Sequence, residues 1–317
     1  MKMKKNEKMS LEDGWKKFLR HCKIKDLSKY TIDYYQDSYD YFTDFLMKEF
    51  QVEDENYEIK ELNSELVDDF ILWIVETYNM NNTSVNTRLR GLRTFINYLI
   101  GKGYIEPFKI SLLTTNDKIK ETYSDQELKK LLKKPNLKKC NFATYRSWVM
   151  INFFLATGAR SRTVRNIKVK DVDLEGATVN LLIVKNKKQQ VIPLSKTMIK
   201  ILEEYLNYRA GEKEDYLFCS IYKGKLKSSS INSAIRTYNL KRGVDKTSPH
   251  LFRHTFAKKW ILAGGDIFRL QKILGHSSMD VVKEYVNMFG KDLKKDFNKF
   301  NPLEQVSSQK EFIDLKK

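Results

Sequence analysis

Four side chains that could act on a phosphate ester lie close together between residues 250 and 285. His250 and Arg253 are three positions apart, His276 follows a Leu-Gly pair, and Tyr285 comes nine residues later. Arginine binds phosphate oxygens through a fork of hydrogen bonds, and histidine transfers protons near neutral pH. A tyrosine hydroxyl can form a covalent intermediate. The set is therefore suited to cutting a phosphodiester.

The first two of these residues are predicted to lie at the start of a helix. Ser248 is expected to cap it and Pro249 to be its first residue, which places His250 and Arg253 on one face. The free backbone N–H groups of such a turn favour an anion. A metal-binding pair of His250 with the histidine four residues later is not expected, because no cysteine or metalloprotease-type glutamate accompanies it.

Two further candidates follow predicted helix ends. Gly275 is expected to end a helix, with His276 just beyond it. A buried helix from Tyr145 to Ala156 is expected to stop at Gly158, so that Arg160 lies just past its end. An arginine after a helix carries little information by itself.

The sequence predicts β structure only between residues 169 and 193. Three short segments rich in Val, Ile and Leu are expected to be strands: 169–174, 178–184 and 190–193. The second turn carries Lys185, Lys187 and Lys188. Hairpin lysines commonly keep an edge strand soluble, so a catalytic or DNA-binding role is the alternative.

Helical periodicity without strands predicts a separate N-terminal domain of about four helices. The first and third helices are expected to begin after the caps Ser10 and Asn63, the second to run from about Ser28 to Phe50, and the fourth to begin at Ser84. The fourth carries polar residues suited to contacts with phosphates and base edges. These residues are Asn86, Arg88, Arg90 and Arg93. The alternative is an ordinary solvated surface.

The domains are expected to be residues 1–106, a linker at 107–121, and residues 122–317. The linker has lost helical periodicity and contains Pro107. After it, Ser124 and Glu127 form a capping box that opens a new helix. The alternative to a linker is an ordered loop within one larger domain.

Composition points to a polyanionic partner. The chain of 317 residues has 58 Lys+Arg against 40 Asp+Glu, a net charge of +18, and cations that neutralise phosphates release counterions. The alternative reading of the charge is a soluble basic protein or a membrane-surface binder. The most apolar stretch, 148–156, is too short to span a bilayer and is expected to be a core helix, and no membrane partner is expected. Three widely spaced cysteines fit a reducing cytoplasm better than a disulfide framework.

In combination these motifs resemble the signature of the tyrosine recombinases, the family of phage and transposon integrases and chromosome-dimer resolvases. The matching motifs are Thr-Gly-Ala-Arg ending at Arg160, His-x-x-Arg at 250–253, Leu-Gly-His ending at His276, and the tyrosine nine positions on. The resemblance implies six catalytic residues: Arg160, Lys185, His250, Arg253, His276 and Tyr285.

Two positions of the resemblance need comment. Lys185 lies eight residues before Pro193, where the family's hairpin carries its catalytic lysine, but Lys187 and Lys188 are rivals. Thr163 stands where the family usually has an acidic residue that orients the first arginine. That carboxylate is either missing or supplied from elsewhere.

The resemblance also implies a fold and a reaction. We expect a mainly α-helical protein with a small antiparallel sheet, made of a helical core-binding domain and an α+β catalytic domain. We expect a site-specific recombinase of double-stranded DNA that forms a 3′-phosphotyrosyl intermediate through Tyr285, without metal, ATP or another cofactor. His250 is the candidate base, His276 a donor to the phosphate, and Lys185 the acid for the 5′ oxygen.

The assembly is expected to be a homotetramer on synapsed sites, with the tail after Tyr285 packing on a neighbouring protomer. Two other functions stay open at this point. One is a DNA-binding architectural or regulatory protein that has lost catalysis, and the other is a DNA-relaxing enzyme of the type IB topoisomerase kind.

Overall fold

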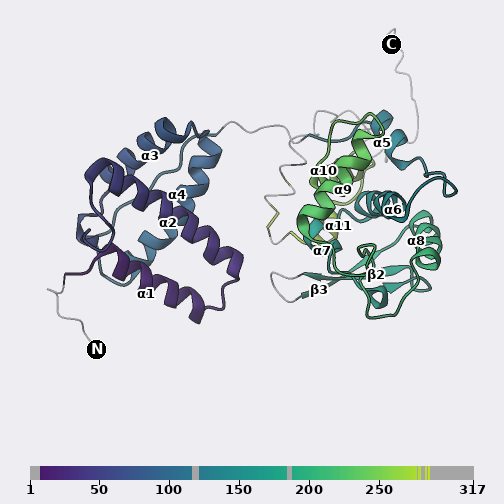
Figure 1. The fold of residues 1–317 in the computed structure, drawn as a ribbon, viewed down its shortest axis with the longest axis horizontal. Coiled ribbons are helices and arrows are strands. Elements are labelled where there is room, and N and C mark those ends of the chain that lie inside the picture. Colours follow the sequence, from purple (N-terminus) through teal and green to yellow (C-terminus); the bar gives the residue numbers. More distant parts are fainter. Residues whose placement is uncertain are drawn as a thin grey trace, which may run out of the picture. The chain divides into compact units, whose positions relative to one another are not determined.

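The computed structural model describes residues 8–115, 121–183, 188–276, 278, 279, 283 and 285, without the side chains of 182, 183 and 188. It divides the chain into two compact units, Met1–Lys118 and Ile119–Lys317, which are drawn in Figure 1. The division falls inside the predicted linker. Each unit is described by itself below.

The described part of the first unit is helical, as predicted. Its elements are α1 (Leu11–Ile24), α2 (Lys29–Phe50), the 3-10 turn η1 (Ile59–Glu61), α3 (Ser64–Tyr78) and α4 (Asn82–Gly101). Side chains of Ser10 and Asn63 cap α1 and α3 as expected, and the side chain of Ser28 caps α2. The prediction for the fourth was wrong by two residues, because Asn81 is the cap and accepts a hydrogen bond from the Ser84 N–H.

The core of the first unit depends on a close crossing of α2 and α4. Ser38 on α2 is fully buried against Gly91 on α4. A Cβ at position 91 would overlap the Ser38 side chain, so glycine is needed for this approach. Around the crossing Trp15 stacks on Tyr39 with ring centroids 4.2 Å apart.

The segment after α4 packs against its own unit as far as the structure describes it. Ile105 and Ile110 are buried in the first core. Asn86 is only 2 % exposed, and its amide donates to the Leu113 carbonyl and accepts from the Leu113 N–H, both at 2.8 Å. The N-terminal part of the predicted linker, residues 107–115, therefore packs on the first unit.

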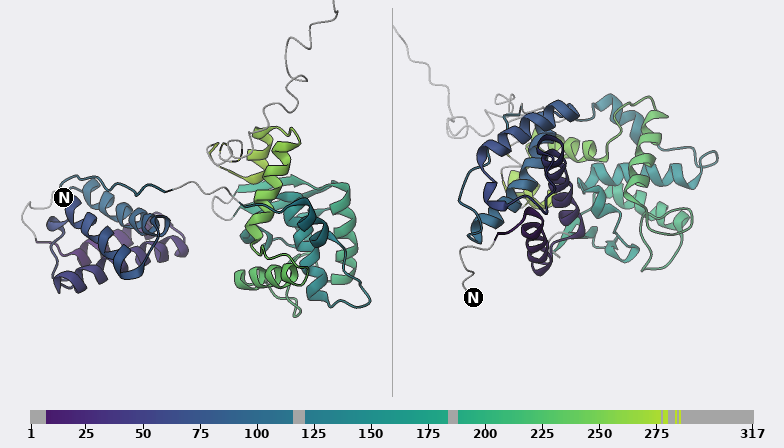
Figure 2. Two further views of the ribbon diagram at one scale, coloured as in Figure 1. Left: turned by 90° about the horizontal axis from the view of Figure 1, so that it is seen from above. Right: turned by 60° about the vertical axis from the view of Figure 1, so that its left-hand side comes forward.

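The described part of the second unit combines helices with one small sheet (Figures 1 and 2). Its helices are α5 (Asp125–Leu132), α6 (Phe142–Thr157), α7 (Ser161–Val164), α8 (Lys196–Arg209), α9 (Ser228–Leu240), α10 (Pro249–Leu262) and α11 (Ile267–Leu274). The sheet consists of β1 (Val172–Asp173), β2 (Thr178–Ile183) and β3 (Lys188–Pro193), preceded by the 3-10 turn η2 (Val169–Asp171).

The three strands pair in sequence order and antiparallel, so the predicted fold class is confirmed. The first strand is shorter than predicted. Asp171 accepts a hydrogen bond from the Lys168 N–H at 2.8 Å, which closes a 3-10 turn over the first residues of the expected strand. β2 and β3 form the hairpin, with Val179 opposite Ile192.

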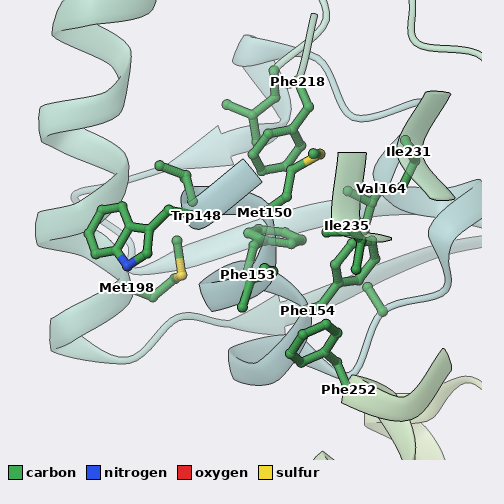
Figure 3. Packing of buried hydrophobic residues seen from close by; sticks show 14 of the residues in the cluster. Trp148, Met150, Phe153, Phe154, Val164, Met198, Phe218, Ile231, Ile235 and Phe252 are labelled. Carbon is green, nitrogen blue, oxygen red and sulfur yellow. The ribbon is translucent and has the colours of Figure 1, made fainter. Parts of the chain in front are cut away.

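Helix α6 is the central element of the second unit and packs against α5, α8, α9 and α10. Figure 3 shows its Phe153 and Phe154 among buried residues that include Met198 of α8, Ile235 of α9 and Phe252 of α10. Phe154 stacks on Phe252 of α10, with centroids 6.4 Å apart and an interplanar angle of 13°. This contact fixes the start of α10 beside α6. No helix among the described residues is long and apolar enough to cross a membrane.

Candidate active site

The start of α10 has the predicted local structure. The Ser248 hydroxyl accepts a hydrogen bond from the His250 N–H at 3.3 Å, and Pro249 lies in the first turn. Arg253 follows one turn later and is only 5 % exposed. Its neighbour Phe252 is buried in the core, and the Arg253 side chain reaches the end of α6.

The end of α6 brings the two arginines to one place. Gly158 ends the helix with a φ of 61°, and its carbonyl accepts a hydrogen bond from Arg253 Nη1 at 2.8 Å. A Cβ at Gly158 would lie 2.7 Å from side-chain atoms of Leu274 and Phe256. Glycine is therefore required here both by backbone conformation and by close packing. Arg160 comes two residues later, at the start of α7.

Both guanidinium groups bind the carbonyl end of α11. Arg253 Nη2 donates to the Leu274 carbonyl at 2.8 Å. Arg160 Nη1 donates to the same carbonyl at 3.3 Å and to that of Gly275 at 3.4 Å, and Nη2 also reaches Gly275 at 3.4 Å. As predicted, Gly275 ends α11, with a φ of 61°. We call the carbonyls of Leu274 and Gly275 the α11 carbonyl end.

The α11 carbonyl end binds both arginines, whereas Thr163 offers no carboxylate to orient Arg160. In the described part of the chain no carboxylate forms an ion pair with Arg160 or Arg253. The last carbonyls of a helix carry partial negative charge and lack partners within the helix, so they attract cations. The orienting groups are thus supplied by the backbone.

His276 lies directly against Arg253. Its Nε2 is 2.5 Å from Arg253 Nη2. Gln271 holds the backbone of His276 from both sides, because its carbonyl accepts from the His276 N–H at 3.1 Å and its amide donates to the His276 carbonyl at 3.2 Å. The motif Leu-Gly-His therefore places a histidine and the Leu274 carbonyl against the guanidinium of Arg253.

The environment lowers the pKa of both arginines and of His250. Burial and the charge of Arg160 lower the pKa of Arg253 to about 10, against the opposite effect of Tyr285. Burial also lowers the pKa of Arg160. Partial loss of hydration, together with the charges of Arg253 and Arg160, lowers the pKa of His250. The site has excess positive charge, which an anion would neutralise.

Tyr285 lies within the same unit and is buried, with 1 % of its surface exposed. It packs with Ala257, Leu270 and Leu274. Its hydroxyl is 2.7 Å from Nδ1 of His254. Sequence reasoning considered His254 only as a metal ligand, although its place one residue after Arg253 was the available signal that it belongs to the site.

The hairpin is tied to the same end of α11. The Gln190 side chain donates to the carbonyls of Lys272 and Ile273, the latter at 2.8 Å. Lys185 and Lys187, the predicted acid and one of its rivals, lie outside the described residues. Lys188 is described only by its backbone, which pairs with Ile183.

The predicted DNA-binding residues of α4 divide into two groups. Arg90 is exposed and Arg93 is half-buried. Arg88 lies over the Tyr41 ring, 4.6 Å from its centroid, and 3.7 Å from Asp37. Asn86 does not fit the expected role, because its amide is buried and bonded to Leu113.

No cluster suited to a metal ion occurs within the described segments, where three His, Cys, Asp or Glu side chains nowhere converge. Cys22, Cys140 and Cys219 are free thiols.

Comparison with protein-family models defines the class of protein. A model described as the phage integrase family matches residues 121–291, and one described as a phage integrase SAM-like domain matches residues 10–119. The chain belongs to the phage integrase family and is a tyrosine recombinase, an enzyme of DNA recombination.

Curated relatives match nearly the whole chain. A tyrosine recombinase of Pseudothermotoga lettingae is 26% identical over 288 residues, which are 89% of this chain and 95% of the relative. Tyrosine recombinase XerC of Leptospira interrogans is 24% identical over 300 residues, covering 92% and 94%.

Solved structures share the fold. The Tn1549 transposon integrase in complex with a circular intermediate DNA has a TM-score of 0.69 at 17% identity, with 89% of this chain and 95% of that chain covered. XerH bound to a palindromic difH substrate has a TM-score of 0.67 at 20% identity, with 84% and 79% covered.

Proposed function

We propose that the protein is a site-specific recombinase that cuts and rejoins double-stranded DNA through a 3′-phosphotyrosyl intermediate on Tyr285. One observation carries the proposal. Arg160, Arg253, His276 and Tyr285 come from four separate segments, and all four contact or lie beside the last turn of α11 or each other. A binding protein would need the cations but would not need the tyrosine.

The two arginines act as a clamp on the phosphate. Each guanidinium uses part of its donors on backbone carbonyls, which fixes its plane, and the others remain for the non-bridging oxygens. Positive charge fixed before the substrate arrives stabilises charge that develops in the transition state. Because this charge comes from side chains, the reaction needs no metal ion. It needs no ATP, because the phosphotyrosyl ester retains the energy of the broken bond.

The proton transfers are assigned to the remaining residues. The phenol of Tyr285 gives its proton to a histidine base as its oxygen bonds to phosphorus, while the bond from phosphorus to the 5′ oxygen breaks. Lys185 supplies the proton to that oxygen, and His276 donates to a non-bridging oxygen. The phosphotyrosyl ester keeps the energy of the broken bond, so that a 5′ hydroxyl of the partner strand can attack it and restore the phenol.

The first unit supplies DNA contacts. Arg88, Arg90 and Arg93 lie along α4, and the net charge of +18 supports binding to a polyanion. Relatives in solved structures are bound to DNA, and lambda integrase, with a TM-score of 0.66 at 13% identity, forms a tetramer on a Holliday junction. We propose the same assembly here, in the reducing cytoplasm that three free thiols suit.

The test begins with a pool of duplexes of randomised sequence that carry a nick in one strand. The nicked strand releases a short fragment after cleavage, so the covalent complex accumulates. We expect the protein to capture particular sequences in an adduct that survives boiling in detergent. In Tyr285→Phe the adduct should vanish while DNA binding survives. An adduct that persists in Tyr285→Phe would overturn the assignment of the nucleophile.

A second substrate identifies the acid among the hairpin lysines. Sulfur in place of the bridging 5′ oxygen gives a leaving group that departs without a proton, because thiols ionise near pH ~8.5. Lys185→Ala should cleave the oxygen substrate about a hundredfold more slowly and the sulfur substrate at the normal rate. If Lys187→Ala or Lys188→Ala is the variant that sulfur restores, the acid is that residue instead.

A further inference from the structure

We propose that His254 is the general base of the reaction and takes the proton of the Tyr285 hydroxyl as the phosphotyrosyl bond forms. The inference rests on the proposed role of Tyr285 as the nucleophile. The carrying observation is the distance of 2.7 Å between His254 Nδ1 and the phenol oxygen. The two ring centroids are 5.7 Å apart. A base must lie within hydrogen-bond reach of the proton it removes, and His254 does.

The surroundings of Tyr285 make a neighbouring base necessary. Its ring is enclosed by Ala257, Leu270 and Leu274, with 1 % of its surface exposed. A phenolate formed there without a partner would lose most of its hydration, which is costly in free energy. Passing the proton directly to His254 as phosphorus is attacked avoids a free phenolate.

The side chains on both sides of His254 are held by hydrogen bonds. Arg253 is bonded to the carbonyls of Gly158 and Leu274. The buried Thr255 hydroxyl donates to the Leu251 carbonyl at 2.6 Å and accepts from the Tyr123 N–H at 2.9 Å. The ring of His254 is therefore carried between two fixed neighbours, and its position relative to the arginines is set by the fold.

His254 also suits the role better than His250, the base expected from the sequence. The charges of Arg253 and Arg160 and partial loss of hydration lower the pKa of His250, which weakens it as a proton acceptor. His250 lies one helical turn before His254, toward the α10 start and the site of the phosphate. There it is placed to contact the phosphate oxygens.

The proton transfers and the bonds at phosphorus balance in both cleavage and rejoining. In the tautomer with hydrogen on Nε2, Nδ1 of His254 accepts the phenol proton. The phenol oxygen then bonds to phosphorus, and the 5′ oxygen leaves with a proton from the hairpin lysine. On rejoining, the 5′ hydroxyl loses its proton to that lysine, and the imidazolium of His254 returns its own proton to the departing phenol oxygen.

The experiment measures single-turnover cleavage of the captured nicked duplex by the full-length protein. His254→Ala should cleave about a hundredfold or more slowly. The sulfur substrate should not restore its rate, because the lost group activates the nucleophile rather than the leaving group. Added imidazole should restore part of the rate in His254→Ala, because it can occupy the vacated space and accept the proton.

Two further variants keep the test decisive. His254→Asn places an amide oxygen near the position of Nδ1, so it can hold the hydroxyl but cannot take its proton, and it should stay slow on both substrates even if His254→Ala folds poorly. His21→Ala is the matched control in the first unit and should cleave normally, without a response to imidazole.

Failure of the role proposed for His254 and failure of the proposed function would give different results. Cleavage by His254→Asn at the wild-type rate, or full recovery of either variant on the sulfur substrate, would overturn the role of His254 while Tyr285→Phe still forms no adduct. An adduct in Tyr285→Phe would instead overturn the proposed function on which the inference depends.

Discussion

The arginines of the two units are held in different ways. Arg253 in the second unit is 5 % exposed and bonded to two backbone carbonyls and a histidine. In the first unit Arg90 is exposed, and Arg88 only lies over an aromatic ring with a carboxylate 3.7 Å away. Exposed ion pairs of that kind contribute little to stability.

The difference corresponds to two tasks. Stabilising a transition state requires charges fixed to a fraction of an ångström before the substrate arrives, because reorganisation costs free energy. Binding along a DNA backbone requires charge near the phosphates but tolerates adjustment of long side chains. Backbone carbonyls provide the first kind of arginine, and an open helix face provides the second.

The largest effect should come from a substitution that keeps the charge but removes the fork. Arg253→Lys has an ammonium that cannot reach both carbonyls and the phosphate, so cleavage should fall roughly a hundred- to a thousandfold. Arg90→Lys should weaken DNA binding no more than about threefold. Single-turnover cleavage and anisotropy titrations measure the two. Equal losses at the two positions would remove the distinction between them.

The next effect concerns the support of Arg253. Gly158→Ala adds a Cβ 2.7 Å from Leu274 and Phe256 at a positive φ, so the second unit should lose about 2–4 kcal/mol of stability. Gly103 also has a positive φ, of 70°, but open space around it. Gly103→Ala should cost only about 1 kcal/mol in the first unit. Calorimetric melting of both variants isolates the contribution of the clash.

A smaller effect is expected on the open face of α4. Arg90→Ala and Arg93→Ala should each reduce the slope of log affinity against log salt by about one, nearly independently of sequence. Arg20→Ala on α1 removes the same charge from another exposed position and is the control. If its slope falls equally, overall charge rather than the α4 face determines binding.

The smallest effect is a pH dependence of stability from His250. Its folded-state pKa is lowered, so the unfolded chain binds the proton first as the pH falls. The stabilising contribution is present above pH ~6.5 and is lost below it. Solvent screening at this exposed ring limits the change to roughly one or two degrees in Tm. His250→Gln should remove the difference in melting between pH 5 and pH 8 that this residue causes.

Local structure was largely readable from the sequence. The capping box of Ser124 and Glu127, the cap at Ser248 and the terminating glycines 158 and 275 were all predicted and confirmed. Each depends on residues within one helical turn, whose backbone groups must find nearby partners. Position 84 was misassigned because Asn81 and Ser84 are both good caps and the difference depends on where the helix packs.

Contacts between distant segments were not readable. Asn86 has an amide side chain of the kind that contacts DNA bases. In the structure this amide is bonded instead to Leu113, which lies 27 residues away in the sequence. Arg160 and the Leu274 carbonyl are separated by 114 residues, and a carbonyl leaves no mark in the sequence. For the same reason Thr163 left open whether the orienting group is missing or supplied from elsewhere, and in the structure backbone carbonyls bind both arginines.

The last turn of α11 also binds the hairpin, through the Gln190 side chain. The hairpin strand and both arginines are bonded to four consecutive carbonyls, those of residues 272 to 275. That turn therefore holds together, through hydrogen bonds, parts of the site that come from different regions of the chain. Because Arg253 is also bonded to Gly158 at the end of α6, a shift of α11 alone would strain that bond and disturb both arginines and the hairpin at once.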